Sequence, residues 1–131
     1  MYKFEARVYF SDTDAGGIVY HTHYLDWAEH ARTEMMREVL PSLEQSDLKN
    51  EGFVFVVKSI DVDYIKPAIL DDVITVYTEM EKIENFSAVI HQAVKRDGEL
   101  LCDIHTKVAF ISMETRRPTR IPAELKLALG R

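Results

Sequence analysis

The stretch DTDAGGIVYHTHY, residues 12–24, lies at the junction between a strand pattern and a helix pattern, and it decides how the rest of the chain is read. It contains two carboxylates, two adjacent glycines and two histidines. Residues 3–10, just before it, mix aromatic and aliphatic residues with polar ones, which is typical of a first β-strand. Acids and flexible backbone therefore stand where a strand is predicted to turn into a helix.

A long helix is predicted from Tyr24 up to the region of Pro41, because a helix rarely continues into the residue before a proline. Its apolar residues recur every three or four positions, at Leu25, Ala28, Ala31, Met35 and Val39. The opposite, polar face is expected to carry Glu29, Arg32 and Glu38. This pattern indicates a helix that packs against a core.

A short second helix is predicted to open at Ser42, since Gln45 follows three residues later as in a capping box, and to fade near Asn50. The apolar period then changes to two. Four long strands are expected, over residues 53–64, 73–81, 86–95 and 100–110, with a tight hairpin at Asp97-Gly98. Hairpins of this kind predict antiparallel pairing.

Composition limits the class of protein. The 131 residues predict one domain spanning residues 1–131, and 47% hydrophobic with 29% charged residues indicate a globular chain. A net charge of −6 argues against a nucleic-acid partner, which would need a basic face. The absence of a long apolar run predicts no membrane span, and the absence of a signal-peptide pattern predicts a cytoplasmic protein. Cys102, the single cysteine, is interpreted as a small buried hydrophobe.

Residues Asp12–His21, followed by Tyr24 and Ala31–Glu34, resemble the signature of hot-dog acyl-CoA thioesterases. The likeness is to the 4-hydroxybenzoyl-CoA thioesterase family and, within it, the Tol-Pal-associated branch. Less specific matches extend it over nearly the whole chain, at Tyr64, Pro67-Ala68, Asp71, Arg116–Pro118 and Ile121-Pro122. The resemblance implies an α+β hot-dog fold, in which a long central helix is wrapped by a curved antiparallel sheet of about five strands.

A sheet of this length with one helix can hide only part of one face, so a second copy of the chain is expected to cover the rest. The resemblance agrees, since two protomers of this family join their sheets around paired active sites. We therefore expect a homodimer or homotetramer whose substrate is an acyl-CoA, or an acyl carrier protein thioester, with no cofactor.

The junction suits thioester hydrolysis, which needs a group that attacks the carbonyl or activates water, and donors for the developing oxyanion. Backbone amides at a helix N-terminus lack partners and carry partial positive charge. Gly16 and Gly17 let the chain turn without side chains that would block a substrate. By resemblance, Asp14 is the catalytic carboxylate, the amide of His21 polarises the carbonyl, and Gly16, Gly17 and Tyr20 contact substrate.

Arg116 and Arg117, with Arg120 nearby, are candidates for binding the phosphates of CoA, because guanidinium groups offer forked donors. The equal alternative is a solvated segment paired with Glu114 and Glu124. Where the nucleotide lies is therefore left open.

Less specific interpretations apply to several of these residues. Both aspartates could be ordinary turn residues, and Asp12 is interpreted as a brace of the loop. His21 and His23 lack a third ligand in the sequence pattern, so no metal is predicted there. His91 and His105 are expected to be solvated or to be cross-strand partners.

Two other functions fit the same sequence. A non-catalytic hot-dog protein could bind acyl-CoA, and a hot-dog hydratase or dehydratase could act on an enoyl thioester. For a thioesterase, two mechanisms stay open: Asp14 could attack the carbonyl directly, or act as general base on water.

Overall fold

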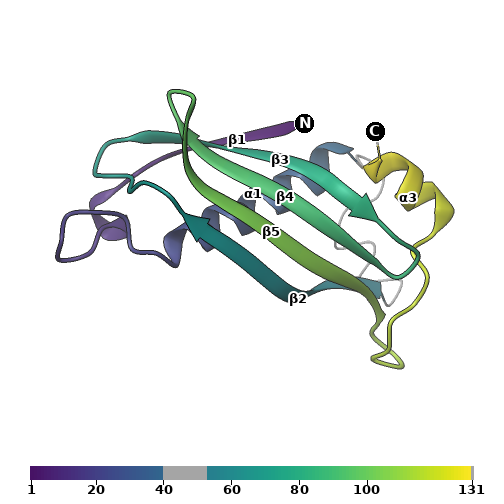
Figure 1. The fold of residues 1–131 in the computed structure, drawn as a ribbon. Helices are drawn as coiled ribbons and strands as arrows, with labels where there is room; N and C mark the ends of the chain where they lie inside the picture. The colour runs from purple at the N-terminus through teal and green to yellow at the C-terminus, as the bar shows by residue number, and fades with distance from the viewer. Residues whose placement is uncertain (40–52, 131) are drawn as a thin grey trace.

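The computed structural model describes residues 1–39 and 53–130, and Figure 1 shows one curved sheet packed on a long helix. The predicted short helix at Ser42 lies outside the described residues. In chain order the elements are β1 (Tyr2–Arg7), the 3₁₀ turn η1 (Phe10–Asp12), α1 (His23–Val39), β2 (Phe53–Tyr64), β3 (Val73–Ile83), β4 (Ser87–Arg96), β5 (Glu99–Ser112) and α3 (Ala123–Leu129).

The five strands form one antiparallel sheet in the order β1-β3-β4-β5-β2. The helix α1 lies behind this sheet in Figure 1, where it packs over β1 and β3. The predicted α+β hot-dog architecture with about five strands is thereby confirmed. Among the described residues no helix is both long and apolar enough to cross a membrane.

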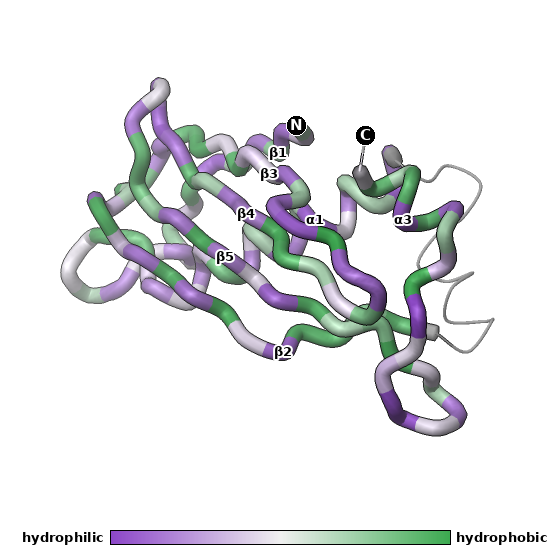
Figure 2. The backbone as a smooth tube through the Cα atoms, turned by 45° about the vertical axis from the view of Figure 1, so that its right-hand side comes forward, coloured by the Kyte–Doolittle hydropathy of each residue, from purple (hydrophilic) through white to green (hydrophobic). Residues whose placement is uncertain are grey.

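Alternation along β4 and β5 explains why the sheet has one buried face. Ala88, Ile90 and Val94 on β4 are buried towards α1, as are Ile104 and Val108 on β5. Figure 2 shows hydrophobic and hydrophilic residues following one another along both strands. Because successive side chains of a strand point to opposite faces, the polar residues between them lie on the outer face of the sheet.

The turn between β4 and β5 confirms the predicted hairpin. Asp97 and Gly98 both have positive φ, at 49° and 81°. A two-residue turn of this hand matches the twist of the flanking strands, and aspartate followed by glycine adopts it at low cost. The hairpin thereby fixes the register of the two central strands.

Two elements differ from the prediction. The first strand ends at Arg7, because the amide of Val8 donates to the carbonyl of Asp72 and the chain then enters η1. The helix α3 was not predicted, since its seven residues are too few to give a clear periodicity. It is held by Leu125 and Leu129, which pack with Phe110 in a second part of the core.

The helical pattern predicted Arg32 on the polar, solvated face of α1, and that prediction is wrong. Arg32 is partly buried, and its guanidinium donates to Oε1 of Gln92 at 3.0 Å. The fully buried amide of Gln92 in turn donates to the carbonyl of Ala28 and to Oγ1 of Thr78. A buried amide needs such partners, so this network ties α1 to the centre of the sheet.

Cys102 is fully buried on β5, as expected. Burial, together with the charges of Asp103 and Asp63, raises the pKa of its thiol to about 12. The group therefore stays protonated at neutral pH.

Candidate active site

Residues 12–20 form a narrow loop before α1, and Figure 1 shows it projecting beyond the end of the sheet. Thr13 and Val19 form a β-bridge, and the amide of Tyr20 donates to the carbonyl of Asp12 at 2.9 Å. The two sides of the loop therefore run alongside each other, with residues 14–17 as the turn.

Asp12 braces this loop, as predicted. One carboxylate oxygen accepts from the amide of Tyr9 at 2.8 Å, and the other lies 2.9 Å from Nδ1 of His23 at the start of α1. The side chain thus joins the entry of the loop to the helix that follows. With its ring nitrogen engaged in this way, His23 acts as a structural partner of Asp12.

Asp14 is exposed at the turn of the loop. Its Oδ1 accepts a hydrogen bond from the amide of Gly16 at 2.8 Å, while its own amide donates to the carbonyl of Ile18. Within the described part of the chain, the carboxylate has no other hydrogen-bond donor, so Oδ2 stays open. The predicted turn role of this aspartate is thus present, and it leaves one oxygen available for chemistry.

The two glycines of the loop have different tasks. Gly17 has φ of 83°, in the left-handed region that residues with a side chain rarely adopt, so it makes the turn possible. Gly16 lies under the Asp14 carboxylate: a Cβ built there would be 3.2 Å from Oδ1 of Asp14. A side chain at Gly16 would therefore push the carboxylate away from its amide partner.

His21 precedes α1 by two residues, and its backbone is held from one side only. The hydroxyl of Tyr64, at the end of β2, donates to the carbonyl of His21 at 2.9 Å. Among the described residues no acceptor pairs with the amide N–H of His21. The first helical carbonyl is that of Thr22, so this free amide stands just before the helix, where the helix dipole favours negative charge.

A cavity of about 260 Å³ opens beside His21. Tyr24 and Tyr64 form its aromatic wall, with ring centroids 5.7 Å apart, and the imidazole of His21 packs on the edge of Tyr64. The cavity is lined by Ile18, Val19, His21, Tyr24, Tyr64, Ile65, Lys66 and Pro67. Asp14 and Tyr20 are not among these residues, but the amide of Asp14 donates to the carbonyl of the lining residue Ile18, so the Asp14 loop borders the cavity.

The floor of the cavity is fixed by the segment after β2. The amide of Ala68 donates to the hydroxyl of the buried Tyr24, and the carbonyl of Ala68 accepts from the amide of Val19. Burial raises the pKa of Tyr24, which keeps the hydroxyl protonated. These bonds connect α1, the loop and the segment at Ala68 into one unit.

A charged pair stabilises the next turn of that segment. Asp72 accepts from the amide of Ile69 and from Nη1 of Arg96 at 2.7 Å. Burial alone would raise the pKa of Asp72, but these two donors outweigh it and hold the pKa below its ordinary value. The turn at Ile69 also touches the loop, since Ile69 and Ile18 form a β-bridge.

The structure does not bring Arg116 and Arg117 to the rest of the predicted site. Both are exposed in the turn after β5, at the end of the sheet opposite to the Asp14 loop in Figure 1. Within the described residues neither forms an ion pair with Glu114 or Glu124, and Arg120 stacks over the ring of Phe86. Their role in binding phosphate stays a prediction, and it would need a substrate that reaches both ends or a second protomer.

Tyr64 is the residue whose role the sequence reasoning missed. Its position in the alternating run Ile60, Val62, Tyr64 predicts an inward side chain, but not the bond to a carbonyl 43 residues earlier in the chain. Strand alternation likewise predicts an inward side chain for Gln92, a polar residue between Ile90 and Val94, but it does not predict the hydrogen bonds of that side chain.

Comparison with known proteins identifies relatives over nearly the whole chain. Residues 8–129 match the family described as the thioesterase-like superfamily. The Acyl-CoA thioesterase YbgC of Haemophilus influenzae is 38% identical over 97% of this chain and 93% of its own. The Acyl-CoA thioester hydrolase YbgC of Escherichia coli O6:H1 is 35% identical over 95% of this chain and 92% of its own.

Solved structures give the same picture. A hypothetical protein from Aquifex aeolicus superimposes with a TM-score of 0.90 at 27% identity, covering 98% of this chain and 99% of its own. A probable thioesterase from Bartonella henselae superimposes with a TM-score of 0.83 at 30% identity, covering 92% of this chain and 98% of its own. The similarity therefore extends through the loop, the helix and the whole sheet.

Proposed function

We propose that this chain, which belongs to the thioesterase-like superfamily, hydrolyses acyl-CoA thioesters to the free acid and CoA. Relatives that match over more than nine-tenths of their length carry names with this activity. The observation that carries the proposal is the amide of His21, which has no acceptor among the described residues, stands before α1 beside a cavity and follows the Asp14 loop.

The chemistry assigns one task to each group. The thioester oxygen accepts from the His21 amide, where the partial positive charge of the helix start stabilises the oxyanion. Asp14 either removes a proton from water, so that the hydroxide attacks the carbonyl carbon, or attacks that carbon itself to give a mixed anhydride that water then cleaves. In both routes the C–S bond breaks and the CoA thiolate leaves, to be protonated by solvent.

A second copy of the chain completes the site in this proposal. Val57 and Ile60, on the inner side of β2, are 44% and 41% exposed, since α1 packs mainly over β1 and β3. The end of the same strand supplies Tyr64 to the cavity. A partner that covers β2 would therefore also close the open side of the cavity, and its Arg116 and Arg117 are candidates for the CoA phosphates.

Asp14→Asn tests the catalytic role. We expect kcat for acyl-CoA hydrolysis to fall by at least about a hundredfold, with the fold intact, because an amide neither attacks a carbonyl nor accepts a proton from water. The measurement is release of free CoA from a panel of short, aromatic and long-chain thioesters. Asp61→Asn, which changes an exposed carboxylate on β2, is the matched control and should keep full activity.

Activity of the Asp14→Asn variant within tenfold of the unchanged protein would refute the assignment. Binding of the substrates without any CoA release by the unchanged protein, or hydration of crotonyl-CoA in its place, would refute hydrolysis itself. If hydrolysis is found, a single turnover in heavy-oxygen water tests direct attack: label in Asp14 identifies a mixed anhydride cleaved by water at the aspartyl carbon, since general-base catalysis places no label there.

A further inference from the structure

Two histidines and one aspartate meet on the outer face of the sheet, away from α1. His91 on β4 and His105 on β5 are direct cross-strand partners, as predicted, and their rings stack with centroids 4.6 Å apart. Nε2 of His91 lies 2.6 Å from Oδ1 of Asp103, and Nε2 of His105 lies 3.2 Å from Oδ2 of the same carboxylate. One ligand atom from each residue falls within 4.8 Å of the other two.

The second nitrogen of each ring is also engaged. Nδ1 of His91 lies 3.0 Å from Oε1 of Glu79, and Nδ1 of His105 lies 2.8 Å from Oε1 of Glu81. A neutral imidazole has one N–H and one lone pair, so the ring that donates from Nδ1 to glutamate presents the lone pair of Nε2. Glutamates in this position are what orient metal-binding histidines in proteins.

Both Nε2 lone pairs then face the oxygens of Asp103, which are acceptors too. Two acceptors at these distances need a proton or a cation between them. If protons fill both places, two imidazolium rings stack on each other as like charges. One divalent cation, bound by both Nε2 atoms and by the carboxylate of Asp103, would replace these protons, and each ring would stay neutral.

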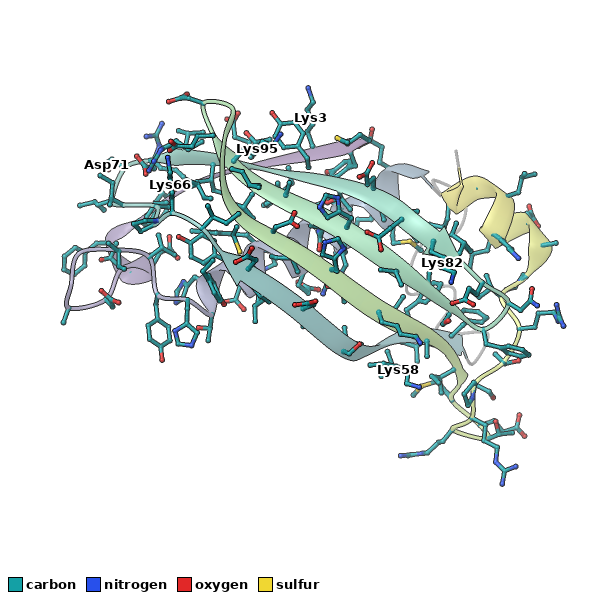
Figure 3. All side chains as sticks on the ribbon, viewed as in Figure 1. Lys3, Lys58, Lys66, Asp71, Lys82 and Lys95 are labelled. Carbon is teal, nitrogen blue, oxygen red and sulfur yellow. The ribbon has the colours of Figure 1, made fainter. Side chains whose placement is uncertain are left out.

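The charge around the cluster favours a cation. The positions opposite His105 and Asp103 on β2 are Asp61 and Asp63. The labelled Lys58 and Lys82 lie towards one end of the sheet in Figure 3, and Lys66 and Lys95 towards the other. Of these, Lys82 is near Glu84, Lys66 pairs with Glu99, and Lys95 lies over Tyr77. Lys107, two residues beyond His105 on the same face of β5, brings one positive charge to a region that holds the carboxylates of Asp61, Asp63, Glu79, Glu81 and Asp103, so the charge there stays negative.

We propose that His91, Asp103 and His105 form a binding site for a divalent transition metal such as zinc, with Glu79 and Glu81 orienting the two rings. Ligands of tetrahedral zinc at 2.0–2.2 Å are about 3.3 Å from each other. With one ligand atom from each residue, the three atoms lie within 4.8 Å of one another, so the side chains need to close their separations by no more than about 1.5 Å to reach this spacing. Three protein ligands leave the fourth position to water.

Zinc titration of tag-free, metal-stripped protein tests the site, with a chromophoric chelator as competitor. Burial lowers the pKa of His91, but Glu79 and Asp103 raise it overall, so the titration is run at about pH 8 to limit competition from protons. The protein should bind one zinc per chain. His30→Ala, which removes an exposed histidine of α1, is the matched control and should bind with the same affinity.

His91→Ala and His105→Ala should each weaken binding at least tenfold, and Glu79→Gln by about tenfold or more through loss of ring orientation. Cobalt added in place of zinc should give a visible absorption band in the unchanged protein that Asp103→Asn loses. Circular dichroism checks that each variant is folded. The proposal is overturned if no stoichiometric zinc binds, or if His91→Ala binds as the unchanged protein does. The proposal also fails if His23→Ala loses zinc binding while the His91 and His105 variants keep it.

Discussion

The hydroxyl of Tyr64 donates to the carbonyl of His21, and that bond fixes the backbone on which the proposed oxyanion donor stands. Tyr64→Phe should leave the cavity wall in place but free the carbonyl of His21. A neutral hydrogen bond is worth about 0.5–1.5 kcal/mol, so we expect kcat to fall about two- to tenfold with KM little changed. Steady-state kinetics on one acyl-CoA measure this.

The control for that variant is Tyr77→Phe. Tyr77 lies on β3 with its ring under Lys3 and Lys95, and its hydroxyl has no hydrogen-bond partner among the described residues. It should therefore keep full activity. Equal activity of the Tyr64→Phe and Tyr77→Phe proteins would argue against a positioning role for Tyr64.

At the scale of elements, the pair of Asp72 and Arg96 holds the turn that supports the cavity floor. Because the pKa of Asp72 is lowered in the folded state, its stabilisation is complete above the unfolded pKa of about 3.9 and is lost as the pH falls through the folded value. We expect Asp72→Asn to lower the free energy of unfolding by about 1–2 kcal/mol at pH 7.

Thermal unfolding between pH 7 and pH 2.5 checks this sign. The difference in Tm between the unchanged protein and Asp72→Asn should begin to shrink below about pH 4, where Asp72 is protonated in the unfolded chain, and disappear as the pH falls through the lower folded pKa and the folded side chain is protonated too. Asp61→Asn, which removes a carboxylate without an ion pair among the described residues, should show no such convergence. A constant difference across the pH range would mean that the charge of Asp72 is not what stabilises the turn.

Elements were predictable from the sequence where one local signal decides them. The bounds of β2 follow from the period of two, and the β4–β5 hairpin follows from an aspartate-glycine pair that tolerates positive φ. Arg32 was misplaced because its partner, Gln92, lies 60 residues away, and helical periodicity carries no information about such a contact. The helix α3 was missed because two buried leucines over seven residues do not define a period.

In the candidate site, too, local features were predictable from the sequence and long-range placements were not. The Asp14 turn follows from local chemistry, since it needs glycine at the left-handed position of Gly17. The placement of Arg116 at the far end of the sheet follows from how strands lie in space, which sequence proximity does not reveal. That the Asp14 loop borders the cavity through Ile18, while the side chain of Asp14 does not line it, is likewise a property of the folded protomer.

At the scale of the whole molecule, the uncovered inner side of β2 predicts the assembly. Ile60→Lys would place a charge on the apolar surface that we assign to the partner. We expect the unchanged protein to have at least twice the chain mass of 15.1 kDa by light scattering, and the variant to be monomeric with CoA release reduced at least tenfold. Ser59→Lys, on the outer side of the same strand, should remain assembled and active.

A monomeric unchanged protein that hydrolyses acyl-CoA would contradict this assembly, as would an Ile60→Lys variant that stays dimeric.

The thiol of Cys102, enclosed in the sheet and protonated, also makes the protein convenient to measure. Disulfide reagents that report released CoA should find no competing sulfhydryl on the native enzyme, so activity can be followed without background correction. The same residue becomes reactive only when β5 separates from its neighbours. The rate at which an alkylating agent modifies Cys102 therefore measures how often β5 separates from the sheet.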